Sequence, residues 1–341
     1  MQLLTPHDEQ TRETLSVGLA EVERRFAAEL LSDLPSVNAL TRHVERYRGK
    51  MLRPTLVLAS AAAAYPERAD DTEFRDRVLT VATVVEMVHM ATLVHDDILD
   101  EAEVRRRGAT INHLRGNEAA VMLGDYLISH AYHLCSAIPL PAASRAIAAA
   151  TNTVCEGELL QLHHREDWAL TERTYFEVIR RKTASLCGVC CRMPAVLATG
   201  ETDGGDDLRA AALFGFGERL GVAFQIVDDV LDLTGDAETV GKSLGRDLAK
   251  GKLTLPLIRC LATAADPARA ELETLLGRGA DEEAVGRLRE AVLAGDGLDY
   301  ARQWAEGLIE QAKAELADVL TDTPSLALLT QMADAVLSRR F

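Results

Sequence analysis

The chain has 341 residues, a formal net charge of -16 and a hydrophobic content of 48% with only 4% aromatic residues. This length allows a large buried core, and the composition, rich in alanine and leucine, favours helices over a β-sandwich. The acidic net charge argues against binding to nucleic acid or to an anionic membrane surface.

The N-terminal stretch "MQLLTPHDEQ" contains no basic segment followed by an apolar one, so we expect no signal peptide and predict a cytoplasmic protein. The apolar segment at 78–99 is interrupted by Glu86, His89, His95 and aspartates, so we do not expect it to span a membrane. The "CGVCC" run at 187–191 has no second CxxC or HxxxH to complete a metal site. We interpret its cysteines as core residues.

Helical periodicity runs through most of the chain and is interrupted where glycine and proline cluster. The interruptions lie at residues 33–36, 63–71, 138–141, 199–207, 234–245 and 322–325. No alternating strand pattern and no flexible linker separates two cores. The sequence therefore predicts an all-α protein with a single helical domain spanning residues 1–341.

The segment "VATVVEMVHMATLVHDDILDEAEV" is apolar on more than one face, as expected of a buried helix. Near its C-terminal end it carries Asp96, Asp97 and Asp100, which we call the first acidic cluster. Buried carboxylates must be paired or must bind metal, and the C-terminal end of a helix dipole is unfavourable for them. Residues i and i+4 share a helix face, so Asp96 and Asp100 can hold one cation with Asp97 beside them. Oxygen ligands of this kind suit magnesium.

His89 precedes Asp96 by seven residues, or about two turns, and therefore returns to the same helix face, where it could contact substrate. His95, His163 and His164 lack such placement, and we interpret them as structural. Beyond the cluster, Arg105 and Arg106 would lie about two turns further along if the helix continued.

A later segment, "FGFGERLGVAFQIVDDVLDLTGD", repeats the pattern with Asp228, Asp229 and Asp232, which we call the second acidic cluster. Two such helices facing each other would hold several magnesium ions between them. The aspartate pairs at 69–74 and 204–210 lack the third aspartate, and we interpret them as solvated loops.

Basic residues accompany both clusters in spite of the acidic whole. They occur in "RGKMLRP" (Arg48, Lys50, Arg53), "RRRG" (Arg105, Arg106, Arg107), "RRKT" (Arg180, Arg181, Lys182) and "GKSLGRDLAKGK" (Lys242, Arg246, Lys250, Lys252). Guanidinium and ammonium groups suit phosphate oxygens. Together with magnesium, they indicate a phosphorylated substrate.

These motifs, in this order, resemble the trans-isoprenyl diphosphate synthases, which are head-to-tail polyprenyl diphosphate synthases. The resemblance runs from "GKMLRP" through "VHMATLVHDDILDEAEVRRRGAT", "LGDYLISHA", "EGELLQL" and "RRKTASL" to "FQIVDDVLDLTGD" and "GKSLGRDLAKGKLTLPL". Met51 stands where many relatives carry arginine, and we expect little consequence because Lys50 and Arg53 are kept. Glu158 and Gln161 belong to a less specific motif, so we assign them no role.

The resemblance implies an all-α isoprenoid synthase fold, one helical bundle around a deep central cavity, a homodimer, and about three Mg²⁺ ions per site. It also implies a role for each matched residue. The metal ligands would be Asp96, Asp100 and Asp228, supported by Asp97, Asp229 and Asp232. Isopentenyl diphosphate would be bound by Gly49, Lys50, Arg53, His89 and Arg106. The allylic diphosphate would be held by Arg105, Lys182, Lys242 and Lys252. Thr183 and Gln225 would face the developing cation. The catalytic residues would be these two together with Lys182 and Lys242.

The implied reaction begins with ionisation of the allylic diphosphate, helped by magnesium and the basic groups, which neutralise the leaving group. The double bond of isopentenyl diphosphate then attacks the allylic cation and a proton is lost. In the usual account of this family the departed diphosphate takes that proton. The product could then be delivered to a membrane.

The length of the product depends on what lies below the first acidic cluster. Val88, Ala91 and Thr92 occupy the positions eight, five and four residues before Asp96, and Ala91 lies about 7.5 Å down the helix axis. In relatives that make farnesyl diphosphate a bulky aromatic residue stands near here. The small Ala91 predicts an open tunnel and a hexaprenyl to decaprenyl product. Alternatively, the floor lies at Met122 or Leu123.

Other readings stay open. A short-chain farnesyl or geranylgeranyl diphosphate synthase would share all the motifs. A class I terpene cyclase would share the first acidic cluster, but usually has an NSE-type triad in place of the second and needs no "GKMLRP" site. An inert subunit of a heteromeric synthase is disfavoured by the intact aspartates and basic groups.

Overall fold

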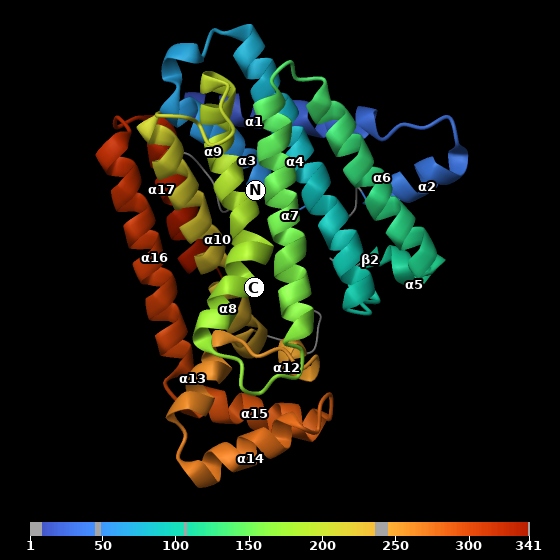
Figure 1. The fold of residues 1–341 in the computed structure, drawn as a ribbon, viewed down its shortest axis with the longest axis vertical. Coiled ribbons are helices and arrows are strands. Elements are labelled where there is room, and N and C mark those ends of the chain that lie inside the picture. The colour runs from blue at the N-terminus through green and yellow to red at the C-terminus, as the bar shows by residue number, and fades with distance from the viewer. Residues whose placement is uncertain (1–8, 45–48, 106–107, 236–244, 340–341) are drawn as a thin grey trace. The chain divides into compact units, whose positions relative to one another are not determined.

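The computed structural model describes residues 9–44, 49–105, 108–235 and 245–339. In these ranges the regular structure is helical apart from one short β-hairpin (Figure 1), which confirms the predicted all-α class. The chain divides into two compact units. Unit 1 comprises residues 1–151, 187–217 and 315–332, and unit 2 comprises 152–186, 218–314 and 333–341. The single domain predicted for residues 1–341 stays a prediction.

Most elements belong to one unit. Unit 1 contains α1 (Glu9–Glu29), α2 (Pro35–Val44), α3 (Leu52–Ala64), η2 (Pro66–Arg68), α4 (Thr72–Leu99), β1 (Val104–Arg105), β2 (Gly108–Ala109), α5 (Ile111–Arg115) and α6 (Asn117–Ser136). Unit 2 contains α8 (Glu172–Ile179), η3 (Arg180–Ala184), α12 (Arg246–Ala249), α13 (Leu255–Thr263), α14 (Asp266–Leu276) and α15 (Glu282–Ala294). The helices with residues in both are α7 (Pro141–His163), α9 (Ser185–Thr199), α10 (Leu208–Thr234), α16 (Gly297–Val319) and α17 (Pro324–Leu337).

Helix α4 is the central element of unit 1 and ends in the first acidic cluster. Asp71 caps its N-terminus by accepting a hydrogen bond from the backbone N–H of Phe74 at 3.0 Å, which satisfies one of the unpaired amides of the first turn. Helices α4 and α10 are long and apolar enough to cross a membrane by composition. However, 72% and 61% of their apolar windows are buried, as in core helices.

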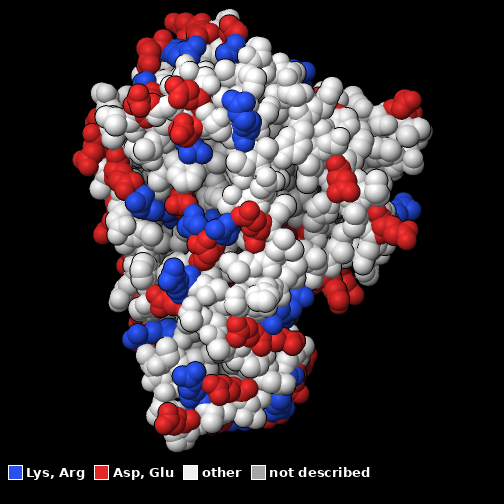
Figure 2. Space-filling model, in the orientation of Figure 1, with Lys and Arg blue, Asp and Glu red and all other residues white. Residues whose placement is uncertain are grey.

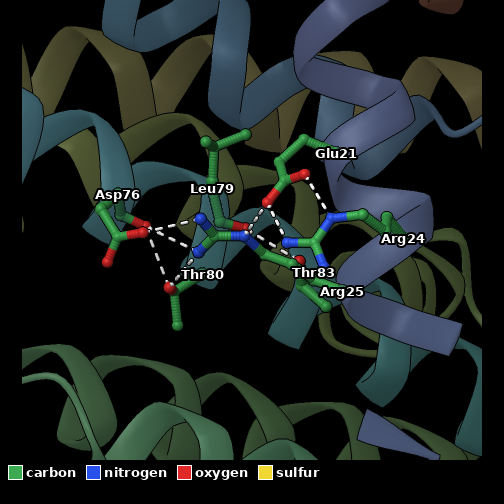
Figure 3. Close-up of polar contacts among 7 residues, drawn as sticks. All are labelled: Glu21, Arg24, Arg25, Asp76, Leu79, Thr80 and Thr83. Atoms are coloured by element: carbon green, nitrogen blue, oxygen red, sulfur yellow. Dashed lines mark hydrogen bonds and ion pairs between the residues drawn. The ribbon is translucent and has the colours of Figure 1, made fainter. Parts of the chain in front are cut away.

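Helix α1 is fastened to α4 by Arg25 (Figure 3). The guanidinium of Arg25 donates to Asp76 Oδ1 at 2.6 Å and to Thr80 Oγ1 at 3.0 Å. On α1 itself, Glu21 accepts hydrogen bonds from Arg24 and Arg25. These bonds, and the one from Arg24 most of all, lower the pKa of Glu21 to about 2. These contacts hold α1 against the first half of α4.

Helix α6 lies beside α4 (Figure 1). The close approach depends on Gly124, because a Cβ there would lie 2.1 Å from Nε2 of His95. His95 therefore packs on a glycine and lies 3.5 Å from the carboxylate of Asp125, which fits the structural role predicted for it. The next turns of α4, toward the chain's N-terminus, contain the residues predicted to set product length.

The cysteines of the "CGVCC" run are packed inside unit 1. Cys187, Cys190 and Cys191 are buried free thiols, and burial raises the pKa of each. Gly217 allows α10 to contact α9 here, since a Cβ at this position would lie 2.4 Å from the carbonyl oxygen of Cys187. These cysteines are core residues, as predicted.

The charged surface includes many local ion pairs. Figure 2 shows basic side chains interspersed with acidic ones over the visible face. Neighbours along single helices account for several pairs, including Arg24 with Glu21 and Arg269 with Glu273. Exposed pairs of this kind contribute little to stability, because solvent and salt screen the attraction between their charges.

Candidate active site

The first acidic cluster lies where α4 ends in unit 1. Asp100 caps the helix, and its backbone N–H donates to the carbonyl oxygen of Asp96 at 2.8 Å, so these two aspartates are one turn apart on one face. Both are half-buried. Asp97 is 1% exposed and its Oδ1 accepts a hydrogen bond from Nε of Arg105 at 2.7 Å. The cluster therefore has an accessible pair and a buried, cation-paired third member.

Arg105 reaches Asp97 because α4 ends at Leu99. The helix therefore does not continue for the two further turns that would have carried Arg105 and Arg106 away from the cluster. Glu101 adopts a left-handed conformation with φ of 47°, and the antiparallel strands β1 and β2 then reverse the chain, with Arg105 paired to Gly108. Helical spacing alone cannot anticipate this reversal, because the hairpin sets where the guanidinium points. Arg106, predicted to bind isopentenyl diphosphate, lies outside the described residues.

The second acidic cluster lies on α10 in unit 2 and shows a similar division. Asp228 is half-buried and pairs with the guanidinium of Arg339 at 2.7 Å. Asp229 is 4% exposed. Its Oδ2 accepts a hydrogen bond from the hydroxyl of Tyr175 at 2.6 Å, and its Oδ1 accepts one from Nε2 of Gln225 at 2.9 Å.

Asp232 lies against the start of the short helix α12. Its carboxylate accepts hydrogen bonds from the backbone N–H groups of Arg246 at 3.3 Å and Asp247 at 3.2 Å. This is the capping geometry that satisfies amides at a helix N-terminus. Asp232 therefore joins α10 to the segment that carries Lys250 and Lys252.

Two aspartates of the second cluster, Asp229 and Asp232, are costly to ionise. Burial raises the pKa of Asp229 well above its usual value and repulsion from Asp247 adds to this, although the bonds from Tyr175 and Gln225 act in the opposite direction. Burial and Asp247 also raise the pKa of Asp232, to about 6, against the effect of the backbone amides. A bound divalent cation would offset this cost, so the carboxylates fit a metal-binding role.

A complete protein cage for a metal is not part of this arrangement. Among the described residues, no group of three or more His, Cys, Asp or Glu side chains converges closely enough to hold an ion by itself. Magnesium commonly takes one or two carboxylates and completes its octahedron with water and substrate phosphate. The Asp96 and Asp100 pair, and Asp228, suit that mode.

Unit 2 also contains a pocket of about 120 Å³ beside the second cluster. The predicted residues that line it are Lys182, Thr183, Gln225, Asp229 and Lys252. Thr183 Oγ1 donates to Oε1 of Gln225 at 3.1 Å. The structure thus gathers ammonium groups, a hydroxyl and a carboxylate that are far apart in sequence. Lys242 lies outside the described residues.

Lys182 and Thr183 lie in η3, a π-helical turn between α8 and α9. Wide turns of this type occur often at functional sites. Gly157 on α7 makes room for the turn, because a Cβ there would lie 2.4 Å from the backbone nitrogen of Lys182. The ammonium of Lys182 forms an ion pair with the carboxylate of Glu158.

In unit 1, the residues predicted to hold isopentenyl diphosphate lie near the start of α3 and on α4. Gly49 and Lys50 are exposed just before Met51, which is buried and left-handed with φ of 52°. Arg53 is half-buried, and its Nε is buried without a hydrogen-bond partner. An orphaned guanidinium donor of this kind fits an anionic ligand. His89 is half-buried on α4.

The residues predicted to set chain length lie along α4. Val88 and Ala91 are fully buried, and Thr92 is half-buried with its hydroxyl donating to the carbonyl oxygen of His89 at 2.8 Å. Of the alternative floor residues on α6, Leu123 is 3% exposed, whereas Met122 is 65% exposed. Only Leu123 is therefore placed to face an interior.

Sequence reasoning missed several polar partners of the site. Tyr175 precedes Lys182 by seven residues, or about two helical turns, and this spacing indicates that the two side chains share a helix face. Glu158 was assigned no role because its motif is common. Asp247 lines the pocket, and Arg339 reaches Asp228 from near the C-terminus. Nothing in the sequence pattern connects either residue with an aspartate on α10.

The chain is similar to known proteins over nearly its whole length. The family model Polyprenyl synthetase matches residues 35–293. Octaprenyl diphosphate synthase of Escherichia coli is 33% identical over 334 residues, covering 97% of this chain and 98% of the relative. Geranylgeranyl pyrophosphate synthase of Geoglobus acetivorans is 34% identical over 304 residues, covering 87% and 89%.

Solved structures show the same similarity. A polyprenyl synthase of Caulobacter crescentus, crystallised with calcium and isoprenyl diphosphate, matches with a TM-score of 0.85 and 34% identity, covering 96% of each chain. A decaprenyl diphosphate synthase of Rhodobacter capsulatus matches with a TM-score of 0.86 and 32% identity, covering 98% of this chain and 99% of that one.

Proposed function

Because the chain belongs to the polyprenyl synthetase family, we propose that it is a trans-polyprenyl diphosphate synthase. It condenses isopentenyl diphosphate head-to-tail with an allylic diphosphate and makes a long, hexaprenyl to decaprenyl, product. One observation carries the proposal: each acidic cluster has a buried second aspartate held by donors of its own unit and a half-buried first aspartate beside it.

This division assigns a task to each carboxylate. Asp96, Asp100 and Asp228 would hold Mg²⁺, about three ions per site, while Asp97, Asp229 and Asp232 support them. When bound, the ions neutralise the allylic diphosphate as it leaves. The Caulobacter crescentus relative, with its calcium and isoprenyl diphosphate, supports the use of a divalent cation.

The basic residues position the two substrates. Lys182 and Lys252 line the pocket beside Asp229 and bind the allylic diphosphate together with Arg105 and Lys242. Gly49, Lys50, Arg53, His89 and Arg106 bind isopentenyl diphosphate, and the orphaned Nε of Arg53 supports this assignment. Fixed positive groups around a leaving diphosphate stabilise the charge that develops as the carbon–oxygen bond breaks.

The oxygen atoms near the reacting carbon come from Thr183 and Gln225. The threonine hydroxyl donates its hydrogen to the glutamine carbonyl, so its lone pairs remain for a neighbouring positive charge. No side chain is assigned as the base, because the departed diphosphate can accept the proton.

The long product rests on Ala91. Its methyl group and the buried Val88 one turn below leave the helix face without a bulky aromatic side chain. Similarity to octaprenyl and decaprenyl diphosphate synthases supports this length, whereas the geranylgeranyl relative keeps a short-chain product as the alternative. We further propose a cytoplasmic homodimer that delivers its product to a membrane.

The test is incubation of the purified protein with Mg²⁺, isopentenyl diphosphate and either farnesyl or geranylgeranyl diphosphate, followed by chromatographic sizing of the prenyl alcohols. Chains of 30 to 50 carbons, about six to ten prenyl units, are expected, and chelation of Mg²⁺ should abolish them. Arrest at 20 carbons, about four units, from farnesyl diphosphate, with no elongation of geranylgeranyl diphosphate, would support the short-chain alternative. A cyclic hydrocarbon would indicate a terpene cyclase, and no product without a second protein would indicate a subunit of a heteromeric synthase.

A further inference from the structure

Tyr175 is a buried phenol whose only described hydrogen bond is to an acidic residue of the site. It lies on α8, is 3% exposed, and donates its hydroxyl hydrogen to Oδ2 of Asp229 at 2.6 Å. A buried hydroxyl needs a partner, and bonds to carboxyl oxygens are among the stronger ones. Tyr175 also lines the pocket that contains Lys182 and Thr183.

The contact with Tyr175 also affects how Asp229 binds Gln225. Because Oδ2 of Asp229 is engaged by Tyr175, Oδ1 is the atom that accepts the hydrogen bond from Nε2 of Gln225 at 2.9 Å. Both oxygens of Asp229 accept in this arrangement, so the NH₂ group of the glutamine faces Asp229. The amide therefore presents its carbonyl oxygen on the opposite side.

That carbonyl oxygen fixes the hydroxyl of Thr183. Oε1 of Gln225 can only accept, so Thr183 Oγ1 donates to it at 3.1 Å. The hydrogen of the threonine is used in this bond, and its lone pairs face away from Gln225. The four side chains are therefore linked by three hydrogen bonds that converge on Asp229, from Thr183 through Gln225 on one side and from Tyr175 on the other.

We propose that Tyr175 is a positioning residue for prenyl transfer, which acts through Asp229 and Gln225 to hold the Thr183 oxygen with its lone pairs toward the allylic cation. The inference rests on the proposed function. Without the tyrosine hydroxyl, Asp229 is held on one oxygen only, and the carboxyl group can rotate and release the orientation of Gln225. The barrier to ionisation then rises, while the lysines that bind the diphosphate are untouched.

The test compares two buried tyrosines that each donate to an aspartate. Tyr65 in unit 1 is 2% exposed and donates to Oδ2 of Asp207 at 2.8 Å. It does not line the pocket that contains Lys182 and Thr183. Tyr175→Phe and Tyr65→Phe each delete one hydroxyl and should lower the melting temperature similarly. Tyr175→Phe should also lower kcat for the first condensation about tenfold with KM for the allylic diphosphate within about twofold, and Tyr65→Phe should leave kcat unchanged.

A double-mutant cycle identifies the route. If Tyr175 acts through Thr183, Thr183→Val and the double variant Tyr175→Phe/Thr183→Val should have nearly the same kcat. Additive losses, or equal kcat for Tyr175→Phe and wild type, would overturn the inference. So would recovery of the Tyr175→Phe variant at high Mg²⁺, because the tyrosine would then position a metal ligand. A wild-type protein that forms no prenyl product would instead defeat the proposed function itself.

Discussion

The guanidinium of Arg339 lies 2.7 Å from the carboxylate of Asp228. The arginine also stacks over the ring of Phe224, 4.0 Å from its centroid. A residue near the C-terminus thus provides a positive charge at the half-buried aspartate that we assign to metal binding. Mg²⁺ and Arg339 would compete for this carboxylate.

Removal of Arg339 is therefore expected to tighten magnesium binding. A partly exposed ion pair is worth up to about 1 kcal/mol, so Arg339→Gln should lower the apparent Kd for Mg²⁺ by up to about fivefold. Titration of activity with Mg²⁺ measures this. Arg302→Gln is the control, because Arg302 and Arg339 both line a second pocket of unit 2, of about 520 Å³, but Arg302 pairs with Asp299. A weaker Mg²⁺ response in Arg339→Gln would contradict the competition.

The two kinds of aspartate in the first cluster should respond differently to substitution. Asp96→Asn and Asp100→Asn each remove a proposed metal ligand and are expected to lower kcat by at least about a hundredfold. Asp97→Asn instead leaves Arg105 with a weaker partner, which should destabilise the protein by about 2 kcal/mol. Steady-state kinetics and thermal unfolding separate these effects. Equal kinetic losses in all variants would contradict the division.

Ala91→Phe tests the determinant of product length. The ring would occupy space along α4 and is expected to shorten the product to about three or four prenyl units. Because Ala91 is fully buried, the larger side chain should also destabilise the protein by about 1–3 kcal/mol. Radiolabelled products of the variant and the parent would be sized together, with Met122→Phe, at an exposed position, as the control. An unchanged product length would reject Ala91 as a determinant.

Gly157 should be essential for the π-helical turn. A methyl group at this position would lie 2.4 Å from the backbone nitrogen of Lys182, so Gly157→Ala must displace the turn that carries Lys182 and Thr183. We expect kcat to fall at least about tenfold.

Gly307 on α16 provides the matched control for that variant. A Cβ there meets nothing within 4 Å, so Gly307→Ala should keep activity and add about 0.5–1 kcal/mol of stability through helix propensity. Full activity in Gly157→Ala would show that the turn tolerates displacement.

Asp207 should make part of the protein's stability depend on pH. Its carboxylate accepts hydrogen bonds from Arg209 and Tyr65, and the bonds from Arg209 are the main reason that its pKa is lowered. A lowered pKa in the folded state stabilises the protein above the unfolded value, about 4, and this stabilisation is lost as the pH falls through the folded value. The wild type should therefore exceed Asp207→Asn in unfolding free energy at pH 7 and lose that advantage toward pH 3. Denaturant titrations at several pH values measure the difference, and a constant gap would contradict the prediction.

The same residue shows how sequence patterns can mislead locally. The aspartate pairs at 69–74 and 204–210 were interpreted as solvated loops. In the structure Asp71 caps α4, and Asp207 anchors Tyr65 and Arg209. The pattern did not reveal the partners of these aspartates, which for Asp207 include a residue 142 positions away in the chain.

The sequence by itself determined the helical class, the helix breaks near residues 33–36, 63–71, 138–141, 199–207 and 322–325, and the two acidic motifs. Periodicity, glycine and proline act over a few residues, and the motifs are local. It also identified the basic residues and their order. Only the tertiary structure decided which aspartate of each cluster is buried and what holds it: Arg105 folds back through a hairpin, and Tyr175 and Arg339 reach α10 from distant positions. Such partners are selected by packing in three dimensions, and no spacing along the chain encodes them.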